Sequence, residues 1–520
     1  MQGLAGNDHP ETLREMLPEP SYLPTVKTKA MDPENELLDV LIVGAGLSGI
    51  GAAHVLQRRC PGKTYLILEG RQALGGTWDL FRYPGVRSDS DMHTLGYSFK
   101  PWTNPKAIAD GPAILDYLHE TAHEAGITQH IRFGHKVVRA AWASADACWT
   151  VEAEHDGQRR TLRARFLYAC SGYYNYEEAH RPEFAGEADF RGRIVQPQFW
   201  PENLNYDGQQ VVVLGSGATA VTLVPTMAKS AARVTMLQRS PSFIVSQPSE
   251  DKIANWLRRH LPGHLAHQLT RWKNVLVQIG LYALARRRPA QAKRQLVGLA
   301  ARQLGPNYDV ATHFTPSYNP WDQRVCLVPD GDLFRALRKG QAAVVTDEIE
   351  RFTPSGLLLK SGRELPADLV VLATGLKIKL LGGITLSVDG RLIHPADTLS
   401  YRGMMLSDVP NLIMAFGYTN ASWTLKVDLT ANYFCRLLRY LDRHQLAIAV
   451  PARPTDLQAR PLLDFSSGYV QRATAELPRQ GSRRPWFVHQ NYLKDLLNIR
   501  YTRINDGTLQ FGPAGQMPGG

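Results

Sequence analysis

The feature that most constrains the fold of this chain is a glycine-rich turn near the N-terminus. The apolar run from Leu38 to Val43 leads directly into Gly44-Ala45-Gly46-Leu47-Ser48-Gly49, and a helix-like stretch then ends near Arg59. A second apolar run, YLIL, ends at Glu69. A parallel strand that is buried on both faces has this kind of continuous apolar run. The sequence therefore predicts a strand, a turn and a helix that bind a dinucleotide.

Each glycine of this turn has its own task in the prediction. Gly44 permits the tight turn, Gly46 lets the backbone approach a pyrophosphate, and Gly49 allows the helix to pack close to the sheet. The helix N-terminus faces the phosphates, because its free amide groups favour negative charge. Glu69 can accept hydrogen bonds from ribose hydroxyls. A purely structural glycine turn is the alternative interpretation.

The same arrangement occurs a second time. The apolar run from Val211 to Leu214 leads into Gly215-Ser216-Gly217-Ala218-Thr219-Ala220, where we expect Gly215, Gly217, Thr219 and Ala220 to contact a second dinucleotide. The next strand, RVTMLQ, is followed by Arg239 and Ser240 in place of an acid. A cation and a hydroxyl suit a 2′-phosphate, so the second site should hold NADP(H) and the first a dinucleotide without that phosphate. An ordinary surface cation is the alternative interpretation of Arg239.

Two further apolar strands, RFLYACSG and DLVVLATG, end in small residues where the chain would cross between the two units. We therefore expect an α/β protein with two nested Rossmann-like dinucleotide-binding domains and a helical insertion. The expected boundaries are an N-terminal extension at 1–36, a first domain at 37–172 and 376–510, a second domain at 173–245 and 320–375, a basic helical insertion at 246–319, and a flexible tail at 511–520.

The cysteines and the N-terminal residues restrict the class and the location of the protein. The chain has five cysteines, widely scattered, without a CxxC pair and without metal-ligand spacing. This usage fits a reducing cytoplasm and counts against a flavin disulfide reductase, which needs a close redox pair. Residues 1–36 are polar and contain no apolar core of a secretory signal, and Met31 is an alternative start.

The formal net charge is +11, and residues 252–305 account for it with eleven Lys and Arg and no Asp or Glu. This segment contains VLVQIGLYALA, from Val275 to Ala285, which is shorter than the ~20 residues that span a bilayer. One interpretation is a helical subdomain whose apolar faces pack inward and whose basic faces are solvated. The other is a peripheral membrane or partner surface. We expect no nucleic-acid partner, because no binding motif accompanies the charge.

Four longer motifs carry a family resemblance. They are GGTWDLFRYPGVRSD at 75–89, FRGRIVQPQFWP at 190–201, YNPWDQRVCLVP at 318–329 and GYTNASWTLK at 417–426. With them the chain resembles the class B flavoprotein monooxygenases, which include Baeyer–Villiger monooxygenases, and most of all their ethionamide-activating subgroup. The resemblance extends from about Leu37 to beyond Trp486.

This resemblance implies FAD in the first site and NADPH in the second, with O2 and a small organic substrate as partners. NADPH would reduce the flavin, and oxygen would add at flavin C4a before one oxygen atom passes to the substrate and the other leaves as water. The flavin supplies the oxygen chemistry, while the protein contributes orientation, charge and the exclusion of water.

The resemblance also assigns residues. Arg324 matches the active-site arginine, a permanent cation placed to stabilise developing negative charge, and Asp89 matches the carboxylate that positions it beside the cofactor. A structural salt bridge is the alternative for this pair. The other expected cofactor residues are Gly76, Thr77, Trp78 and Tyr83 along the flavin pocket, Trp423 and Lys426 near the flavin and nicotinamide, and Arg239 and Ser240 at the 2′-phosphate. Packing is the alternative for Trp78, Tyr83, Trp423 and Lys426.

One position departs from the family. The fingerprint is met at Phe190, Gly192, Trp200 and Pro201, but Gln196 stands where the family has histidine. In the family this histidine belongs to the linker that couples the domains. Glutamine can hold a hydrogen bond but cannot exchange a proton near neutral pH.

Gln196 leaves three interpretations open. The enzyme is complete because the hydrogen bond matters more than the proton, or its reaction preference is shifted, or reduced flavin leaks hydrogen peroxide. We favour heteroatom oxygenation, which is N-oxidation of an aromatic heterocycle such as a phenazine or S-oxidation, by analogy with the subgroup. Baeyer–Villiger oxidation of a ketone to an ester is the alternative, and a non-catalytic flavin redox sensor or membrane-docking protein is the remote one.

Overall fold

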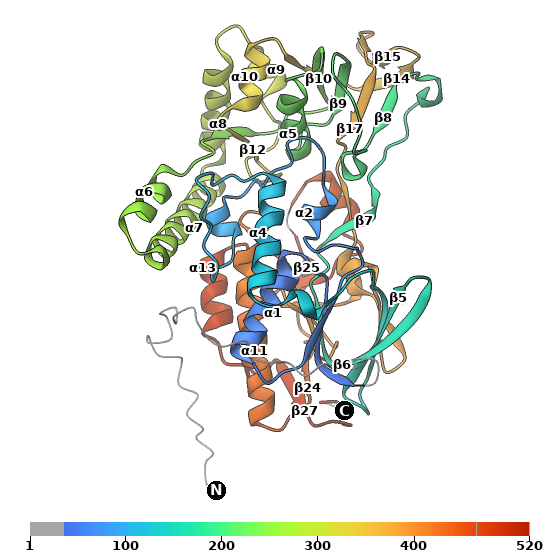
Figure 1. The fold of residues 1–520 in the computed structure, drawn as a ribbon, viewed down its shortest axis with the longest axis vertical. Coiled ribbons are helices and arrows are strands. Elements are labelled where there is room, and N and C mark those ends of the chain that lie inside the picture. The colour runs from blue at the N-terminus through green and yellow to red at the C-terminus, as the bar shows by residue number, and fades with distance from the viewer. Residues whose placement is uncertain (1–35, 464, 519–520) are drawn as a thin grey trace.

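The computed structural model describes residues 36–463 and 465–518, so the N-terminal extension expected at 1–36 lies almost wholly outside the described residues. Within the described part, two units that are each built on a β-sheet lie one above the other along the long axis of the molecule (Figure 1). The first unit takes its strands from both halves of the chain, and the second takes them from the middle.

The first unit is built on a nine-stranded sheet. Its strands follow in the order β20 (Arg391–Ile393), β19 (Thr385–Val388), β4 (Lys136–Ala143), β5 (Cys148–His155), β6 (Gln158–Ala169), β1 (Leu37–Val43), β2 (Tyr65–Leu68) and β3 (Ile131–Arg132), and β23 (Leu412–Met414) also pairs with β6. β1 runs parallel to β2 and to β6. The carboxyl ends of these three strands therefore meet at one edge of the sheet.

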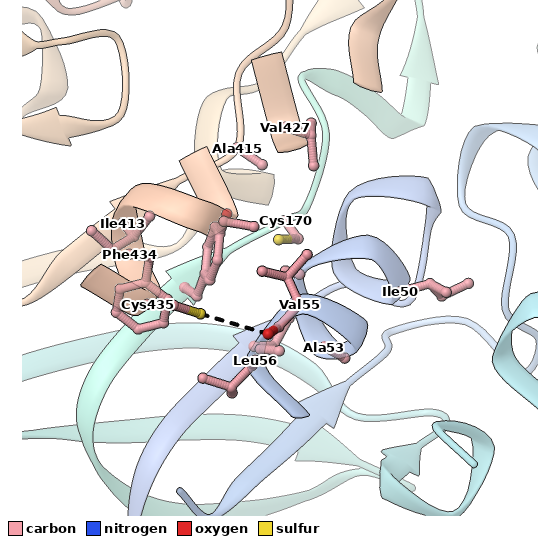
Figure 2. Close-up of a cluster of buried hydrophobic side chains, with 14 of the residues drawn as sticks. Ile50, Ala53, Val55, Leu56, Cys170, Ile413, Ala415, Val427, Phe434 and Cys435 are labelled. Atoms are coloured by element: carbon pink, nitrogen blue, oxygen red, sulfur yellow. Dashed lines mark hydrogen bonds between the residues drawn. The ribbon is translucent and has the colours of Figure 1, made fainter. Parts of the chain in front are cut away.

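Three helices cover one face of this sheet: α1 (Leu47–Arg59), α4 (Gly111–Glu124) and α11 (Trp423–Arg443). α11 buries a stripe at helical spacing, made of Val427, Ala431, Phe434, Leu438 and Leu441. Figure 2 shows this core, in which Val55 and Leu56 of α1 meet Phe434 and Cys435 of α11. The Cys435 thiol donates a hydrogen bond to the Val55 carbonyl, with 3.8 Å between sulfur and oxygen.

The second unit is built on a five-stranded sheet in which all pairings are parallel. The strand order is β13 (Ala342–Thr346), β10 (Arg233–Gln238), β9 (Gln210–Leu214), β17 (Leu369–Leu372) and β8 (Arg193–Val195). The helices α5 (Ala218–Met227) and α10 (Asp332–Arg338) pack on one face. The small sheet of β14 (Ile349–Thr353), β15 (Gly356–Leu359) and β16 (Glu364–Pro366) covers the other face.

The chain crosses between the two units twice. It leaves the first unit through β7 (Tyr174–Ala179) and returns through β18 (Leu376–Ile378), and these two strands pair antiparallel. Both crossings therefore lie side by side.

The basic segment forms α6 (Lys252–His260), α7 (Gly263–Arg287), α8 (Pro289–Leu304) and α9 (Val310–His313). The pair α6 and α7 projects from the side of the molecule (Figure 1). Val275 and Ala285 are buried, but Trp256, Leu269 and Leu276 are exposed. The interpretation that the apolar faces all pack inward is therefore wrong, because one face of these helices is largely open to solvent. No described helix is long and apolar enough to cross a membrane.

The C-terminal part contributes α12 (Gly468–Ala473), α13 (Tyr492–Asp495), β24 (Ile448–Pro451) and β27 (Leu509–Gly512). Phe511 and Gly512, which the sequence places in a flexible tail, instead pair with β24, and Phe511 packs on Tyr440 at 4.9 Å between ring centroids. The remaining elements are α2 (Thr77–Leu80), α3 (Met92–Leu95), β11 (Ile244–Gln247), β12 (Cys326–Pro329), β21 (Ser400–Tyr401), β22 (Met405–Leu406), β25 (Ala459–Pro461) and β26 (Arg479–Gly481).

Candidate functional site

A cavity of about 1200 Å³ lies between the two units. Its lining includes the carboxyl ends of β1, β2 and β6, the start of α5, and one side of α7. In open α/β sheets ligands bind at this edge, because strand ends and helix N-termini meet there. The volume exceeds the ~300–1,000 Å³ of a pocket for one small ligand. The cavity therefore has room for more than one bound group.

The first glycine turn lies at this edge. Gly44 has a φ of +103°, and a Cβ there would lie 2.6 Å from the Cys170 carbonyl oxygen at the end of β6. A Cβ at Gly49 would lie 1.9 Å from the Gly44 carbonyl oxygen, so α1 packs directly on the turn. Gly46 is the N-cap of α1, and a Cβ there would lie 3.5 Å from the Gly76 Cα. Gly44 and Gly49 are therefore required by the close approach of the backbone, because a Cβ at either position would collide with a carbonyl oxygen.

Glu69 is buried at the end of β2 and lines the cavity. Its carboxylate accepts a hydrogen bond from the Ala45 amide at 2.7 Å and another from the Arg71 amide at 2.9 Å. Burial raises the pKa of Glu69, and these two hydrogen bonds oppose the rise. Each carboxylate oxygen has a further lone pair, so Glu69 can hold the glycine turn and still accept from a ligand hydroxyl.

The second glycine turn repeats the backbone device. Gly215 has a φ of +131°, and a Cβ there would lie 2.4 Å from the Ala373 carbonyl oxygen beyond β17. Gly217 is the N-cap of α5, and a Cβ there would meet open space. Thr219 lines the cavity. The side chain of Ala220 is fully buried in the core of the second unit, where it lets α5 pack close to the sheet.

Arg239 and Ser240 follow β10 and are both exposed. They lie outside the lining of the large cavity, but the Ser240 carbonyl accepts a hydrogen bond from the Ser216 hydroxyl at 3.1 Å. Both residues are therefore next to the second glycine turn and open to solvent. A hydrogen bond from Lys360 and the nearby Arg239 guanidinium lower the pKa of the Glu348 carboxyl, and Arg239 stays accessible to an anionic ligand group.

Arg324 and Asp89 come together in the cavity, where the Arg324 Nη1 lies 3.8 Å from the Asp89 Oδ2. This distance is too long for a hydrogen bond, so the two side chains interact by electrostatic attraction. Burial disfavours the charged guanidinium, but Tyr469, Tyr173, Tyr174 and Asp89 raise the pKa of Arg324 overall, so it remains a cation. Burial raises the pKa of Asp89, and the positive charge of Arg324 opposes the rise.

The residues of the motif at 75–89 divide between the two units. Gly76, with a φ of +56°, Thr77 at the start of α2, and Trp78 all line the cavity on the side of the first unit. Tyr83 also lines the cavity, yet it packs in the core of the second unit and shares a hydrogen bond with Thr219. Burial raises the pKa of Tyr83 to about 12. Tyr83 therefore links the two units.

Trp423 begins α11 and lines the cavity. Its indole Nε1 donates to the Ser48 hydroxyl on α1 at 2.8 Å, and its ring stacks on Tyr173 at 5.1 Å. Lys426, one helical turn later, does not line the cavity. Its ammonium pairs at 2.7 Å with the buried Asp495 of α13. This contact favours the packing interpretation of Lys426, because α11 turns the side chain toward the C-terminal segment.

The fingerprint at 190–201 lies at the outer edge of the second sheet. Gly192 precedes β8, and a Cβ there would lie 2.5 Å from the Asp368 carbonyl oxygen. Phe190 packs on Phe352, and Trp200 packs against Tyr206. The Gln196 amide nitrogen is buried and has no hydrogen-bond partner among the described residues. These fingerprint residues do not line the large cavity.

The sequence did not single out several lining residues. Tyr173, Tyr174 and Tyr176 follow β6 and line the cavity, and the Tyr173 and Tyr174 hydroxyls lie 2.7 Å apart. Their position in the sequence, three tyrosines shortly after a strand that ends beside the first glycine turn, is the pattern that indicates a place in the site. Val277 and Leu281 of α7 also line the cavity. The sequence shows that Val277 and Leu281 are spaced to share one face of a helix. Whether that face points into the cavity depends on how α7 packs.

The residues present fit two dinucleotides. Two helix N-termini follow glycine turns, and at Gly44 and Gly215 a positive φ and a close carbonyl oxygen exclude a Cβ. The first turn lines the cavity, and the second leads into Ala218 and Thr219, which line it. The first turn ends at a buried carboxylate and the second at an exposed cation. This difference fits FAD in the first turn and NADP in the second.

Comparisons with known proteins agree with this geometry. The family described as flavin-binding monooxygenase-like matches residues 97–270, and an NAD(P)-binding Rossmann-like domain matches residues 42–106. The FAD-containing monooxygenase EthA of Mycobacterium tuberculosis is 55% identical over 478 residues, which cover 92% of this chain and 98% of that protein. The probable FAD-binding monooxygenase AlmA of an Acinetobacter species is 48% identical over 92% of this chain and 97% of that protein.

A solved structure shares the fold. An oxidized steroid monooxygenase bound to NADP superposes with a TM-score of 0.67 at 22% identity, over 80% of this chain and 88% of that chain.

Proposed function

The chain belongs to the class B flavoprotein monooxygenases, and on this premise we propose that it transfers one atom of O2 to nitrogen or sulfur of a small organic substrate. It is an FAD-containing enzyme that takes its electrons from NADPH. The proposed substrates are an aromatic heterocycle such as a phenazine, which gains an N-oxide, or a thioamide, which is oxidised at sulfur.

The two glycine turns support the assignment of the cofactor residues. Gly44, Gly46, Gly76 and Thr77 would hold FAD at its pyrophosphate, with Glu69 at its ribose. The NADPH contacts would come from Gly215, Gly217, Thr219, Arg239 and Ser240. The bound flavin, once reduced, supplies the electrons that activate O2.

Arg324 would act on charge at the reacting centre. Its guanidinium is a permanent cation, so it can stabilise negative charge that develops in the cavity. Asp89 would hold the guanidinium in place through their charge interaction. Trp423 and Tyr173, stacked on each other, would shield this region from water.

The observation that carries the heteroatom assignment is Gln196. A glutamine amide cannot take up or release a proton near neutral pH, and the Gln196 amide nitrogen has no hydrogen-bond partner among the described residues. Oxygen transfer to nitrogen or sulfur makes fewer demands on proton control than insertion next to a carbonyl. The sequence departs from its family at this position while the cavity residues Arg324 and Asp89 remain.

Baeyer–Villiger oxidation of a ketone is the second candidate. The Arg324–Asp89 pair favours it, because a fixed cation in the cavity suits the anionic oxidant that attacks a carbonyl.

A product assay decides between the two reactions. The FAD-loaded protein is incubated with NADPH and, in parallel reactions, with an aryl ketone, a thioamide or a phenazine. The products are identified by mass spectrometry. We expect one added oxygen on the thioamide or the phenazine and no ester from the ketone. Ester formation without heteroatom oxidation would overturn the proposal in favour of the second candidate.

Two variants separate the roles. Gln196→His should bring ketone conversion into the assay, while Gln158→His, at an exposed position of β6, should change nothing. Arg324→Ala should remove every oxygenated product and leave flavin reduction by NADPH intact, because the charge acts after reduction.

We also propose the domain layout and the setting of the reaction. Residues 37–172 and 376–510 would form the FAD-binding domain, and 173–245 with 320–375 the NADP-binding domain, which the origin of the strands in each sheet supports. The enzyme would work in the cytoplasm on O2 and a small organic substrate, with no nucleic-acid partner. Residues 252–305 would provide a peripheral membrane contact.

A further inference from the structure

The helices α6 and α7 carry most of the large hydrophobic side chains that are exposed in the described chain. On α7, Leu265, Leu269, Trp272 and Leu276 form a stripe at helical spacing, with between 38% and 53% of each side chain exposed. On α6, Ile253 and Trp256 are 57% and 56% exposed. We call these six residues the apolar face. Soluble proteins seldom expose such a contiguous set unless it binds a partner.

The segment that carries the apolar face has an excess of positive charge, although Asp251 pairs with Lys273 and Asp322 with Arg286. Residues 252–305 contain no acid, and Arg259 of α6, Arg287 of α7 and Arg288 directly after α7 are exposed. An exposed apolar stripe bordered by Lys and Arg is the composition of a helix that lies in the surface of an anionic bilayer. Tryptophan, present here twice, is enriched at the membrane–water interface.

A second copy of the chain is the less suitable occupant. In a symmetric dimer the same face meets itself, so the exposed arginines of two copies would come together and repel. An anionic lipid surface instead attracts them. Because none of the described helices can span a bilayer, the contact would be peripheral.

The apolar face continues into the cavity. Leu276 of the exposed stripe is followed by Val277, which lines the cavity together with Leu281 and Leu284 of the same helix. Ile253 of α6 belongs both to the exposed face and to the cavity lining. The outer surface and the entrance to the candidate active site thus share one apolar border.

We propose that the apolar face seats the enzyme on an anionic lipid bilayer, so that lipophilic substrates pass from the bilayer directly into the cavity. The substrate class, membrane-soluble compounds with an oxidisable nitrogen or sulfur, rests on the proposed function. The docking itself does not, because it depends only on α6 and α7.

Sedimentation with vesicles tests the docking. The FAD-loaded full chain is mixed with vesicles of phosphatidylcholine, or with vesicles in which about a third of the lipid is anionic phosphatidylglycerol. The second kind has a negatively charged surface. We expect pelleting with the anionic vesicles that weakens as salt is raised. No pelleting with anionic vesicles, or pelleting that salt does not change, would overturn the proposal.

Matched variants locate the surface. Trp256→Ser with Leu269→Ser and Leu276→Ser should lower the bound fraction at least ~10-fold, since each removes buried apolar area from the membrane contact. Arg259→Ser with Arg287→Ser should lower it ~5-fold for each charge removed. The control is Arg391→Ser with Leu392→Ser on the edge strand β20, where Leu392 is 55% exposed, and it should pellet like the unchanged protein.

Size-exclusion chromatography of the same proteins completes the test. A dimer that the apolar-face variant abolishes, with no vesicle binding, would show that a second copy occupies this face and would overturn the proposal.

Turnover then tests the substrate class. Anionic vesicles should speed oxidation of a long-chain thioamide held in the bilayer and leave a short, water-soluble thioamide unaffected, and the apolar-face variant should lose only the first effect. Absence of turnover of either thioamide would count against the proposed function and leave the sedimentation result standing. Equal vesicle effects on both thioamides would overturn the substrate class.

Discussion

The two glycine turns use the same backbone device but end differently. At Gly44 and at Gly215 a positive φ brings the turn against a carbonyl oxygen at the end of the neighbouring parallel strand, Cys170 in one unit and Ala373 in the other. The first turn is then closed by the buried Glu69, which accepts from the Ala45 amide. The second turn ends at the exposed Arg239.

This difference shows which part of a nucleotide fold selects its ligand. The glycines make room for a pyrophosphate in both units and carry no preference between dinucleotides. The preference lies at the end of the second strand, where a carboxylate suits ribose hydroxyls and a guanidinium suits a phosphate. Substitution of a glycine should therefore disrupt nucleotide binding in the same way at both turns, whereas substitution of Glu69 or Arg239 should change the ligand preference of one turn only.

The largest expected effect comes from breaking the turns themselves. Gly44→Ala should give protein without the flavin absorbance near 450 nm, because a Cβ would lie 2.6 Å from a carbonyl oxygen and the positive φ alone costs about 1–2 kcal/mol. Gly215→Ala should keep its flavin but lose reduction by NADPH. Gly62→Ala, where a Cβ meets open space, is the control. Loss of flavin in both turn variants would mean that the units do not fold independently.

Removal of the exposed cation should have the next largest effect. Arg239→Ala should raise the KM for NADPH about 10- to 100-fold, since a charge-assisted hydrogen bond contributes about 1.5–3 kcal/mol. The KM for NADH should stay the same, because NADH has no 2′-phosphate. Steady-state kinetics with both coenzymes makes the measurement. An equal rise for NADH would show that Arg239 supports the fold rather than the phosphate.

Tyr83 tests how the two regions are joined. Tyr83→Phe removes a hydroxyl that shares a hydrogen bond with Thr219, so we expect a loss of about 1 kcal/mol in the free energy of unfolding and a few-fold slower flavin reduction. Stopped-flow mixing with NADPH and urea unfolding give the two values. An unchanged reduction rate would confine Tyr83 to packing.

The smallest expected effect concerns the pH dependence of the first turn. Burial raises the pKa of Glu69 above its ordinary value of 4.5, so the folded protein binds this proton more tightly than the unfolded chain. The stabilisation from Glu69 is then greatest below pH 4.5 and falls as the pH rises toward the raised pKa. Glu69→Gln should flatten this fall in urea unfolding of the FAD-free protein. A slope that persists in the variant would assign it to another group.

The backbone of both nucleotide turns could be predicted from the sequence, because the apolar run, the glycine spacing and the residue at the next strand end lie within one short segment. Contacts between distant segments could not. Tyr83 stands in a motif of the first unit yet packs in the core of the second, and Lys426 pairs with Asp495 rather than lining the cavity. Such partners depend on how whole elements pack, which local spacing does not encode.

The basic segment shows the same limit. Its helices were expected from the composition, and its apolar run from Val275 to Ala285 was expected to have a buried side. The structure divides this run between a buried part, a cavity lining and an exposed stripe. A sequence pattern reports that a helix has an apolar face, but the neighbours of that face come from the tertiary structure.

The pairing of β7 with β18 has a consequence for how this architecture can be rebuilt. The chain leaves the first unit and returns to it at one place, so the second unit is an insertion whose two ends are adjacent. Such an insertion can be treated as an exchangeable cassette. Exchange for a homologous unit would leave the register of the strands in the first sheet unaltered, but the new unit would have to accept Tyr83, which the recipient supplies to its core. The hybrid protein would then have the coenzyme preference of the donor, because the proposed NADP site lies in the exchanged unit. It would keep the flavin site of the recipient.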